Sequence, residues 1–284
     1  MKLAPQKPAF LMGLFITLVA LTLAACNNAA AQTRPTPTIA PQTTLTVSGS
    51  GGTTAILKYL AEVYRRQHSD LAFEFLSGAG TSGGVKGVLA EQLDLGTMSR
   101  PPKDSELADG IAYLHFGTEK VVVATSSDVS ITGLTSQQVK DIFLGKIKNW
   151  SEVGGPDAAI SVLVRDEEET NTKILRQGLF GEAAFTAGAV VFTSEGDLKS
   201  ALASTTHAIA YLAYGGIRLE NLKVNPVAID GQEPANLNGD YPYTRPVGVA
   251  YLPANAAKVQ PFLDFITSPE ARTLLTEQGI TLDK

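Results

Sequence analysis

The sequence predicts an α/β fold with largely parallel sheets, and three observations carry this prediction. Short apolar runs alternate with segments whose apolar residues recur at helical spacing, as Ile56, Tyr59 and Val63 do. Two glycine-rich loops, 48–54 and 77–84, each stand between an apolar run and a helical segment. The chain can form a large core, because 44% of its 284 residues are hydrophobic. Strands that alternate with helices in this way are typical of parallel sheets covered by helices.

The elements follow one another along the whole chain after residue 44. The runs predicted as strands are 45–47, 73–76, 111–116, 120–125, 160–164, 190–192, 209–212, 227–229 and 247–251. Helices are predicted after both glycine loops. Another helix is expected to begin at Thr135, which with Gln138 has capping-box spacing, and to end at Gly145. Two helices are expected to close the chain, the second beginning at Ser268 and Pro269.

Residues 1–25 are predicted to be a lipoprotein signal peptide. A short basic start precedes an apolar run, from Phe10 to Ala25, that is short for a membrane span. The run ends in Leu-Ala-Ala-Cys, the pattern at which bacterial lipoproteins are cleaved and lipidated on the new N-terminal cysteine. Cys26 is the only cysteine, so the chain cannot form an internal disulfide. The alternative is a transmembrane anchor. Residues 26–43 are rich in alanine, threonine and proline and are predicted to be a flexible tether.

The charge of the chain argues against nucleic acid as a partner. The whole chain carries a net charge of −5. Without Lys2 and Lys7 of the predicted signal peptide, 21 basic residues remain against 28 acidic ones, which makes the mature charge −7. The sequence contains no basic stripe. Such a protein can bind an anion only through local dipoles and a few well-placed arginines.

Both glycine loops have the composition of an anion-binding cradle. Glycine lets the backbone turn its N–H groups toward one point, and the helix that follows adds the positive end of its dipole. Threonine and serine add neutral hydroxyl donors. The candidate donors are Thr53 and Thr54 in the first loop and Thr81 and Ser82 in the second. The alternative is a pair of glycine-rich turns that bind nothing.

The second loop also matches two enzyme motifs. Residues 78–83 match G-x-G-x-x-G, but a dinucleotide site needs an acidic residue about 20 positions further on, at a strand end. The chain instead has a turn at 99–102. Residues 80–84 match the G-x-S-x-G elbow of serine hydrolases. A hydrolase with Ser82 as nucleophile and His207 as base therefore stays open as a rival hypothesis.

Several segments of the chain match the motifs of one protein family and follow one another in the same order. They are the loop 48–54 followed by 80–86, 94–100, 134–135 with 141–147, 149–155, 208–211 and 241–246. The most specific of them is Ile-Phe-x-Gly-Lys-Ile-x-Asn-Trp at 142–150. In this order the chain resembles the phosphate-binding lipoproteins of bacterial ABC phosphate transporters, within the type II periplasmic binding protein superfamily. The resemblance covers nearly all of residues 45–284.

The resemblance implies a two-lobed type II periplasmic-binding-protein fold, with two α/β lobes joined by two hinge strands. Lobe one would comprise 44–124 plus 247–284 and lobe two 125–246, with Val121–Thr125 and Val247–Tyr251 as the hinge. The implied protein is extracytoplasmic, anchored to the membrane by its lipid, and monomeric. It captures inorganic phosphate for the permease subunits of an ABC importer and is neither an enzyme nor a cofactor- or metal-dependent protein. The alternatives are another oxyanion or a phosphonate as ligand, or a non-transporting sensor.

The resemblance also assigns binding roles to individual residues. The residues with implied roles are Thr53, Thr54, Thr81, Ser82, Arg100 and Arg165. Arg100 belongs to the Ser-Arg turn of many members, and Arg165 matches the arginine that reaches in from lobe two. An exposed turn is the alternative for Arg100, and a surface arginine at a strand end is the alternative for Arg165.

One segment departs from the family pattern. The lobe-two arginine of the family is followed by Ser-Gly-Thr, whereas this chain continues with Asp166-Glu167-Glu168-Glu169-Thr170. Thr170 is expected to keep the threonine role. A carboxylate buried beside a divalent anion repels it. We therefore expect most of these acids to face water at a helix start, where acids suit the dipole. The alternative is a changed ligand, including one with a cationic group, or a site that has lost binding and serves signalling.

Overall fold

The structure, a computed structural model, describes residues 43–236 and 241–282. All of them belong to one compact unit, residues 40–284. Cys26, the predicted signal peptide and the tether up to residue 42 lie outside the described residues. None of the helices in the described ranges is long and apolar enough to cross a membrane.

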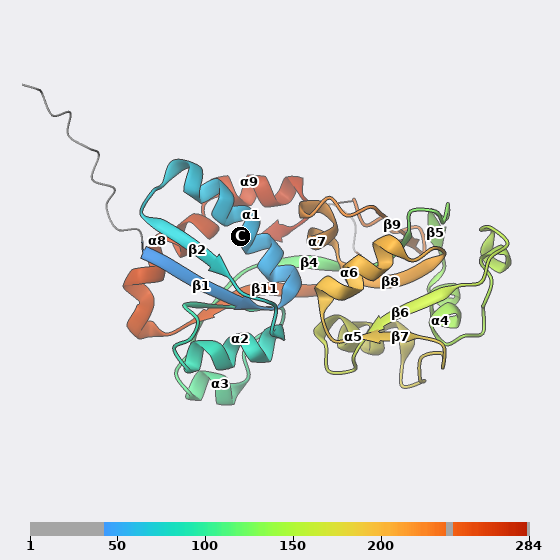
Figure 1. The fold of residues 1–284 in the computed structure, drawn as a ribbon, viewed down its shortest axis with the longest axis horizontal. Helices are drawn as coiled ribbons and strands as arrows, with labels where there is room; N and C mark the ends of the chain where they lie inside the picture. Colours follow the sequence, from blue (N-terminus) through green and yellow to red (C-terminus); the bar gives the residue numbers. More distant parts are fainter. Residues whose placement is uncertain (1–42, 237–240, 283–284) are drawn as a thin grey trace, which may run out of the picture. The chain divides into compact units, whose positions relative to one another are not determined.

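The elements alternate along the chain as predicted (Figure 1). The described strands are β1 (Thr43–Gly49), β2 (Leu71–Phe75), β3 (Leu95–Met98), β4 (Ala112–Ser126), β5 (Gly133–Leu134), β6 (Ser161–Arg165), β7 (Val190–Phe192), β8 (Ala208–Ala213), β9 (Val224–Pro226), β10 (Ala228–Ile229), β11 (Thr244–Tyr251) and β12 (Thr281–Leu282). The described α-helices are α1 (Gly51–Gln67), α2 (Gly80–Leu89), α3 (Asp104–Ala108), α4 (Ser136–Phe143), α5 (Thr170–Leu175), α6 (Glu195–Ser204), α7 (Tyr214–Leu219), α8 (Ala256–Ile266) and α9 (Pro269–Glu277). The shorter helices are η1 (Trp150–Val153), η2 (Arg176–Phe180) and η3 (Pro253–Asn255).

The main sheet is mixed, which corrects the prediction of largely parallel sheets. Its strand order is β2-β1-β3-β11-β4-β8-β6-β7. Strands β1, β2 and β3 are parallel, and so are β6, β7 and β8. Between these two groups, β4 and β11 run antiparallel to each other and to their outer neighbours. Two parallel halves are therefore joined by an antiparallel centre.

Strand β4 merges two runs that the sequence separated. The runs at 111–116 and 120–125 belong to one strand of 15 residues. The intervening Gly117 and Thr118 stay extended because they pair with Val247 and Pro246 of β11. This pairing lies far away in the sequence, so local pattern could not reveal it. Strand β3 was also missed, because Gly96 and Thr97 interrupt its short apolar run.

The apolar core divides at the centre of β4. Val121 to Ala124 pack in a cluster around Trp150 and Tyr211, whereas Phe116 packs in a second cluster with β1, α1 and α8. We call the part around the Phe116 cluster lobe one and the part around the Trp150 cluster lobe two. Residues 121–125 of β4 pair with β8, and residues 248–250 of β11 pair with β3. The chain therefore passes between the two clusters at 117–120 and 244–246, and the lobe boundaries given above stay a prediction.

The predicted helix starts agree with the structure. Strand β1 ends at Gly49 just before α1, and four residues separate the end of β2 from the start of α2. In α4, the Thr135 hydroxyl accepts the N–H of Gln138, whose side chain accepts the N–H of Thr135. The Ser268 hydroxyl likewise accepts the N–H of Ala271 at the start of α9. Both glycine loops therefore stand at carboxyl ends of parallel strands, where α/β proteins bind ligands.

Candidate binding cleft

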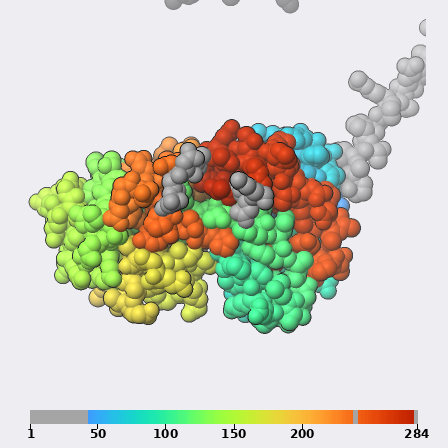
Figure 2. All heavy atoms as spheres, turned by 180° about the vertical axis from the view of Figure 1, so that it is seen from behind, coloured from blue at the N-terminus to red at the C-terminus, as the bar shows by residue number. Residues whose placement is uncertain are grey.

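A cleft of about 980 Å³ runs between the two lobes. Lobe one contributes the starts of α1 and α2 and the turn after β3. Lobe two contributes the β6–α5 and β7–α6 connections. Figure 2 shows a notch between the yellow atoms of the α5 region and the teal atoms of α2 and α3. Four of the predicted hydroxyl residues line the cleft: Thr54, Thr81, Ser82 and Thr170.

The first glycine loop brings the start of α1 to the cleft. Gly49 has a φ of +138°, and a Cβ there would lie 2.3 Å from the Thr97 carbonyl oxygen, so only glycine suits this turn. The Thr54 hydroxyl lies 2.8 Å from the Thr97 hydroxyl, which donates to the Ser50 carbonyl. Ser50 also lines the cleft. Ser50 belongs to the first glycine loop but is not one of its predicted donors, Thr53 and Thr54.

Thr53 does not line the cleft. Its side chain is fully buried, and its hydroxyl donates to the Met98 carbonyl at 3.0 Å. The helical turn from Gly51 points this side chain into lobe one rather than toward the cleft. The structure thus places the Thr53 hydroxyl in a structural contact, away from the other predicted donors.

Three hydroxyls form a chain across the cleft. The Thr81 hydroxyl lies 3.1 Å from the Ser99 hydroxyl, which donates to the Thr170 hydroxyl at 3.1 Å. The Ser99 N–H also donates to Thr81. Thr170 begins α5 in lobe two, so this chain joins donors of both lobes. Ser99 was not predicted as a site residue, because its place in this chain depends on Thr81 and Thr170, which lie far from it in the sequence.

The two predicted arginines differ in how they are held. Arg100 pairs with Glu106 through two hydrogen bonds, at 2.7 and 2.8 Å, and its contact with the Ser82 hydroxyl is longer, at 3.3 Å. These hydrogen bonds from Arg100 lower the pKa of Glu106. Arg165 instead donates to the Phe192 and Thr193 carbonyls, at 3.0 and 2.9 Å. The nearest carboxylate, Asp166, is 3.9 Å away. Arg165 thus makes no hydrogen bond to a carboxylate of the described residues, although it lies in the cleft wall.

Three of the four acids in the departing segment are well exposed, and two of these, Asp166 and Glu168, also line the cleft. Glu168 pairs with Lys173, and Glu167 pairs with Arg176. The side chains of Glu167 and Glu168 are 60% and 88% exposed, and that of Asp166 is 36% exposed. Their carboxylates are therefore solvated.

Glu169 is different from these three. It caps α5, and one carboxylate oxygen accepts the N–H groups of Asn171 and Thr172 at 2.7 and 3.1 Å. The residue is partly buried and lines the cleft. Burial raises the pKa of Glu169, as does the nearby Glu195, against the opposing effects of Arg245 and Arg165.

Glu195 is a second carboxylate at the cleft that the sequence did not suggest. It is 6% exposed, and its Oε2 accepts the Gly52 N–H at 2.9 Å, at the start of α1. Its Oε1 lies 3.8 Å from Lys199 Nζ. Burial raises the pKa of Glu195, but Lys199, Arg245, Arg165 and the Gly52 N–H together lower it by more, so the net shift is downward. This contact runs from lobe two to lobe one.

Beneath the cleft, a buried ion pair connects the two crossing strands. Arg245 of β11 and Glu119 of β4 are cross-strand neighbours, and their side chains are fully buried. Arg245 donates to Glu119 at 2.9 Å and to the Asn171 side chain at 3.1 Å. A Cβ at Gly52 would overlap the Arg245 guanidinium. Gly52 therefore lets the start of α1 approach this ion pair.

The hydrolase constellation is not assembled. The Ser82 hydroxyl lines the cleft and contacts Arg100. His207 does not line the cleft; it precedes β8 and pairs with Asp128 at 2.9 Å. A serine nucleophile needs its base within hydrogen-bond reach, so the hypothesis of a hydrolase with Ser82 as nucleophile and His207 as base is wrong.

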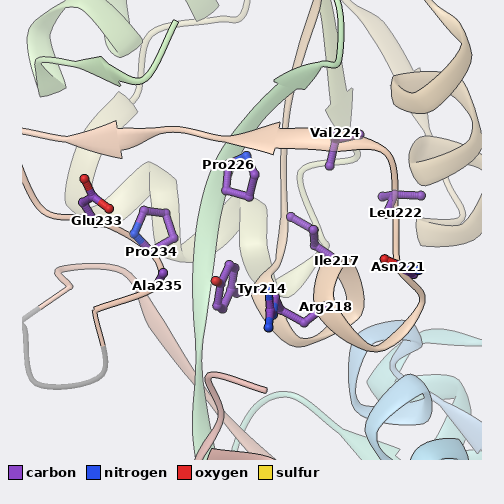
Figure 3. A pocket seen from close by; sticks show the side chains of 10 residues that line it. All are labelled: Tyr214, Ile217, Arg218, Asn221, Leu222, Val224, Pro226, Glu233, Pro234 and Ala235. Atoms are coloured by element: carbon purple, nitrogen blue, oxygen red, sulfur yellow. The ribbon is translucent and has the colours of Figure 1, made fainter. Parts of the chain in front are cut away.

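A second hollow of about 310 Å³ lies between α7 and the segment 233–235 (Figure 3). Its lining includes Tyr214, Arg218 and Glu233 but none of the predicted site residues. The cleft between the lobes is therefore the better candidate for the functional site.

Comparison with known proteins agrees with this architecture. A profile of the PBP superfamily domain matches residues 33–270. The chain belongs to this superfamily. Among the relatives of this chain, the phosphate-binding protein PstS of Bacillus subtilis is 27% identical in sequence, and the alignment covers 96% of this chain and 94% of that protein. PstS of Borreliella burgdorferi is 25% identical, covering 81% and 87%.

Two solved structures have the same fold as this chain. A Clostridium perfringens protein, described as a phosphate ABC transporter substrate-binding protein with bound phosphate, has a TM-score of 0.73 at 25% identity. The match covers 85% of this chain and 100% of that one. A phosphate transport receptor from Vibrio cholerae has a TM-score of 0.59 at 23% identity, covering 84% and 100%. The predicted fold class, the type II periplasmic-binding-protein fold, is thereby confirmed.

Proposed function

We propose that this protein captures inorganic phosphate between its two lobes and delivers it to the permease subunits of an ABC importer. The observation that carries the proposal is the arrangement of donors around the cleft. Two helices of 17 and 10 residues begin at lobe-one glycine loops, and Arg165 faces them from lobe two. The names of the relatives point to the same ligand.

The geometry explains how such a site holds an oxyanion without covalent chemistry. Backbone N–H groups at the starts of α1 and α2 and the hydroxyls of Ser50, Thr54, Thr81 and Ser99 are neutral donors. Arg165 adds a charge-assisted donor, and the Phe192 and Thr193 carbonyls hold its guanidinium in place before any ligand arrives. A guanidinium fixed in this way needs little rearrangement when the anion binds. The Thr54 and Ser99 hydroxyls, which donate to Thr97 and Thr170, would have to turn toward the anion.

The remaining predictions belong to the same proposal. Lobe one would comprise 44–124 plus 247–284 and lobe two 125–246, and they would close over the ligand as a hinge. The mature protein would be an extracytoplasmic monomer, anchored through lipid on Cys26, with no enzymatic activity and no cofactor.

Calorimetric titration of the mature protein, with its endogenous ligand removed by partial unfolding and refolding, tests the proposal. Phosphate should bind with a stoichiometry near one, and sulfate should bind far more weakly. A folded protein that releases no heat with phosphate would contradict the proposed function. Circular dichroism before and after refolding shows whether the protein is folded.

A further inference from the structure

We propose that Glu169 couples anion capture in this cleft to the uptake of one proton. In its ionised form Glu169 places a negative charge on the lobe-two wall and accepts the N–H groups of Asn171 and Thr172. In its protonated form it removes that charge and offers an O–H donor to the ligand. The inference rests on the proposed function and specifies how the same site is regulated.

The position of Glu169 is the first argument. It lies in the segment where the resemblance implies Ser-Gly-Thr, a set of neutral donors. A serine hydroxyl can donate to an oxyanion, whereas a carboxylate can only accept. The ionised Glu169 therefore opposes an oxyanion at a wall that Arg165 and Thr170 otherwise make favourable for one.

The charged groups around Glu169 already include more carboxylates than cations, which is the second argument. The groups that face it are Arg165 of β6, Glu195 of α6 and Arg245 of β11. Behind them, Glu119 pairs with Arg245, and Lys199 lies near both Glu195 and Glu220, at 3.8 and 2.9 Å. Asp166 lies 3.9 Å from Arg165. With Glu169 ionised, five carboxylates therefore stand against three cations, and a bound dianion would add further negative charge to a partly desolvated site, which is costly.

Asp166 and Glu220 are 36% and 44% exposed, so water already solvates their charge. Of the other three carboxylates in this set, Glu169 is the one that can accept the proton. Glu119 is fully buried and receives hydrogen bonds from Arg245. Glu195 receives the Gly52 N–H and lies near Lys199, and its pKa is lowered. Glu169 has no hydrogen-bonded cation among the described residues, lines the cleft, and has a raised pKa because of burial and Glu195.

The protons balance as follows. The protein with ionised Glu169, one dianion and one solvent proton form a complex with neutral Glu169 and a bound dianion. A ligand that arrives as a monoanion and passes its proton to Glu169 gives the same complex. Where the reaction takes up one proton, the affinity falls by up to about tenfold for each unit of pH rise.

The test is calorimetry with inorganic phosphate on the mature protein, Glu169→Gln and Glu169→Ser, at a pH of about 5.5 and about 8. Two buffers with different ionisation enthalpies are used at each pH, because the difference in heat counts the protons exchanged. Phosphate itself titrates in this range, and comparing each variant with the parent cancels that contribution. Glu167→Gln is the matched control, since it removes a neighbouring acid that pairs with Arg176 and does not line the cleft.

At the higher pH, the parent and Glu167→Gln should take up about one proton more than Glu169→Gln. Glu169→Gln should also bind phosphate more tightly than the parent at that pH, by up to about tenfold, and lose less affinity as the pH rises. Equal proton uptake and equal pH dependence in the parent and both Glu169 variants would overturn the inference while phosphate capture stands. Folded parent and variants that all fail to bind phosphate would instead overturn the proposed function. Glu169→Ser keeps the test decisive if the glutamine variant does not fold.

Discussion

The two walls of the cleft are built on different physical principles. The lobe-one wall consists of helix starts and hydroxyls, and its one prominent ion pair, Arg100–Glu106, is satisfied within lobe one. The lobe-two wall and the crossing strands beneath it hold several charged groups with low exposure, among them Arg165, Glu195 and Arg245. The lobe-one wall offers an anion neutral dipoles, whereas the lobe-two wall sets the charge that the anion meets. Capture depends on both walls, but pH dependence should arise in the second.

The largest expected effect comes from breaking the buried Arg245–Glu119 ion pair beneath the cleft. Arg245→Met should lower the free energy of unfolding by about 3–5 kcal/mol, because it leaves Glu119 buried without its partner. Urea unfolding followed by circular dichroism measures this. The double variant Arg245→Met with Glu119→Leu should recover much of the loss. An unchanged unfolding midpoint in the single variant would show that the ion pair does not stabilise this region.

Removal of the available arginine should have the next largest effect. Arg165→Ala should weaken phosphate binding by about tenfold to a hundredfold, as expected for a hydrogen bond to a charged group. Titration calorimetry measures the change, with Arg66→Ala, an exposed arginine near the end of α1, as the control. If both variants bind phosphate as the parent does, Arg165 is not part of the site.

A hydroxyl of the lobe-one wall should matter less than the arginine. Thr81→Val should weaken phosphate binding by roughly fivefold, the effect of losing about 1 kcal/mol from a neutral hydrogen bond. Thr81→Ser, which keeps the hydroxyl that contacts Ser99, should stay close to the parent. Comparable loss in both variants would indicate that the methyl group, and hence packing, is what matters.

The smallest expected effect concerns the ion pair of lobe one. Because hydrogen bonds from Arg100 lower the folded-state pKa of Glu106, the pair stabilises the fold above the ordinary glutamate pKa. This contribution is lost as pH falls through the lowered value. Glu106→Gln should therefore cost under about 1 kcal/mol at neutral pH, and the difference from the parent should vanish in acid. Thermal unfolding across pH measures it, and a difference that grows in acid would contradict the assignment.

How much could be predicted depended on the range of the interactions involved. The α4 capping box and the starts of α1 and α9 follow from side chains within a few residues of one another, so local pattern was enough. The join within β4 and the role of Gly52 depend on β11, which lies far along the chain. Thr53 was assigned to the cleft from its motif, yet the turn of α1 directs its hydroxyl to Met98.

The sequence by itself determined that this is an α/β chain with two glycine-rich helix starts, an available arginine after the 160–164 run and an unusual acidic segment. These features are local, because each depends on neighbours in the chain. Only the tertiary structure decided which acidic side chains are buried beside the cleft and which are exposed. Glu169 lies in a predicted segment, but its burial and its nearness to Glu195 and Arg245 come from three separate elements. The charge of a site is a sum over groups brought together by folding, and no stretch of sequence contains that sum.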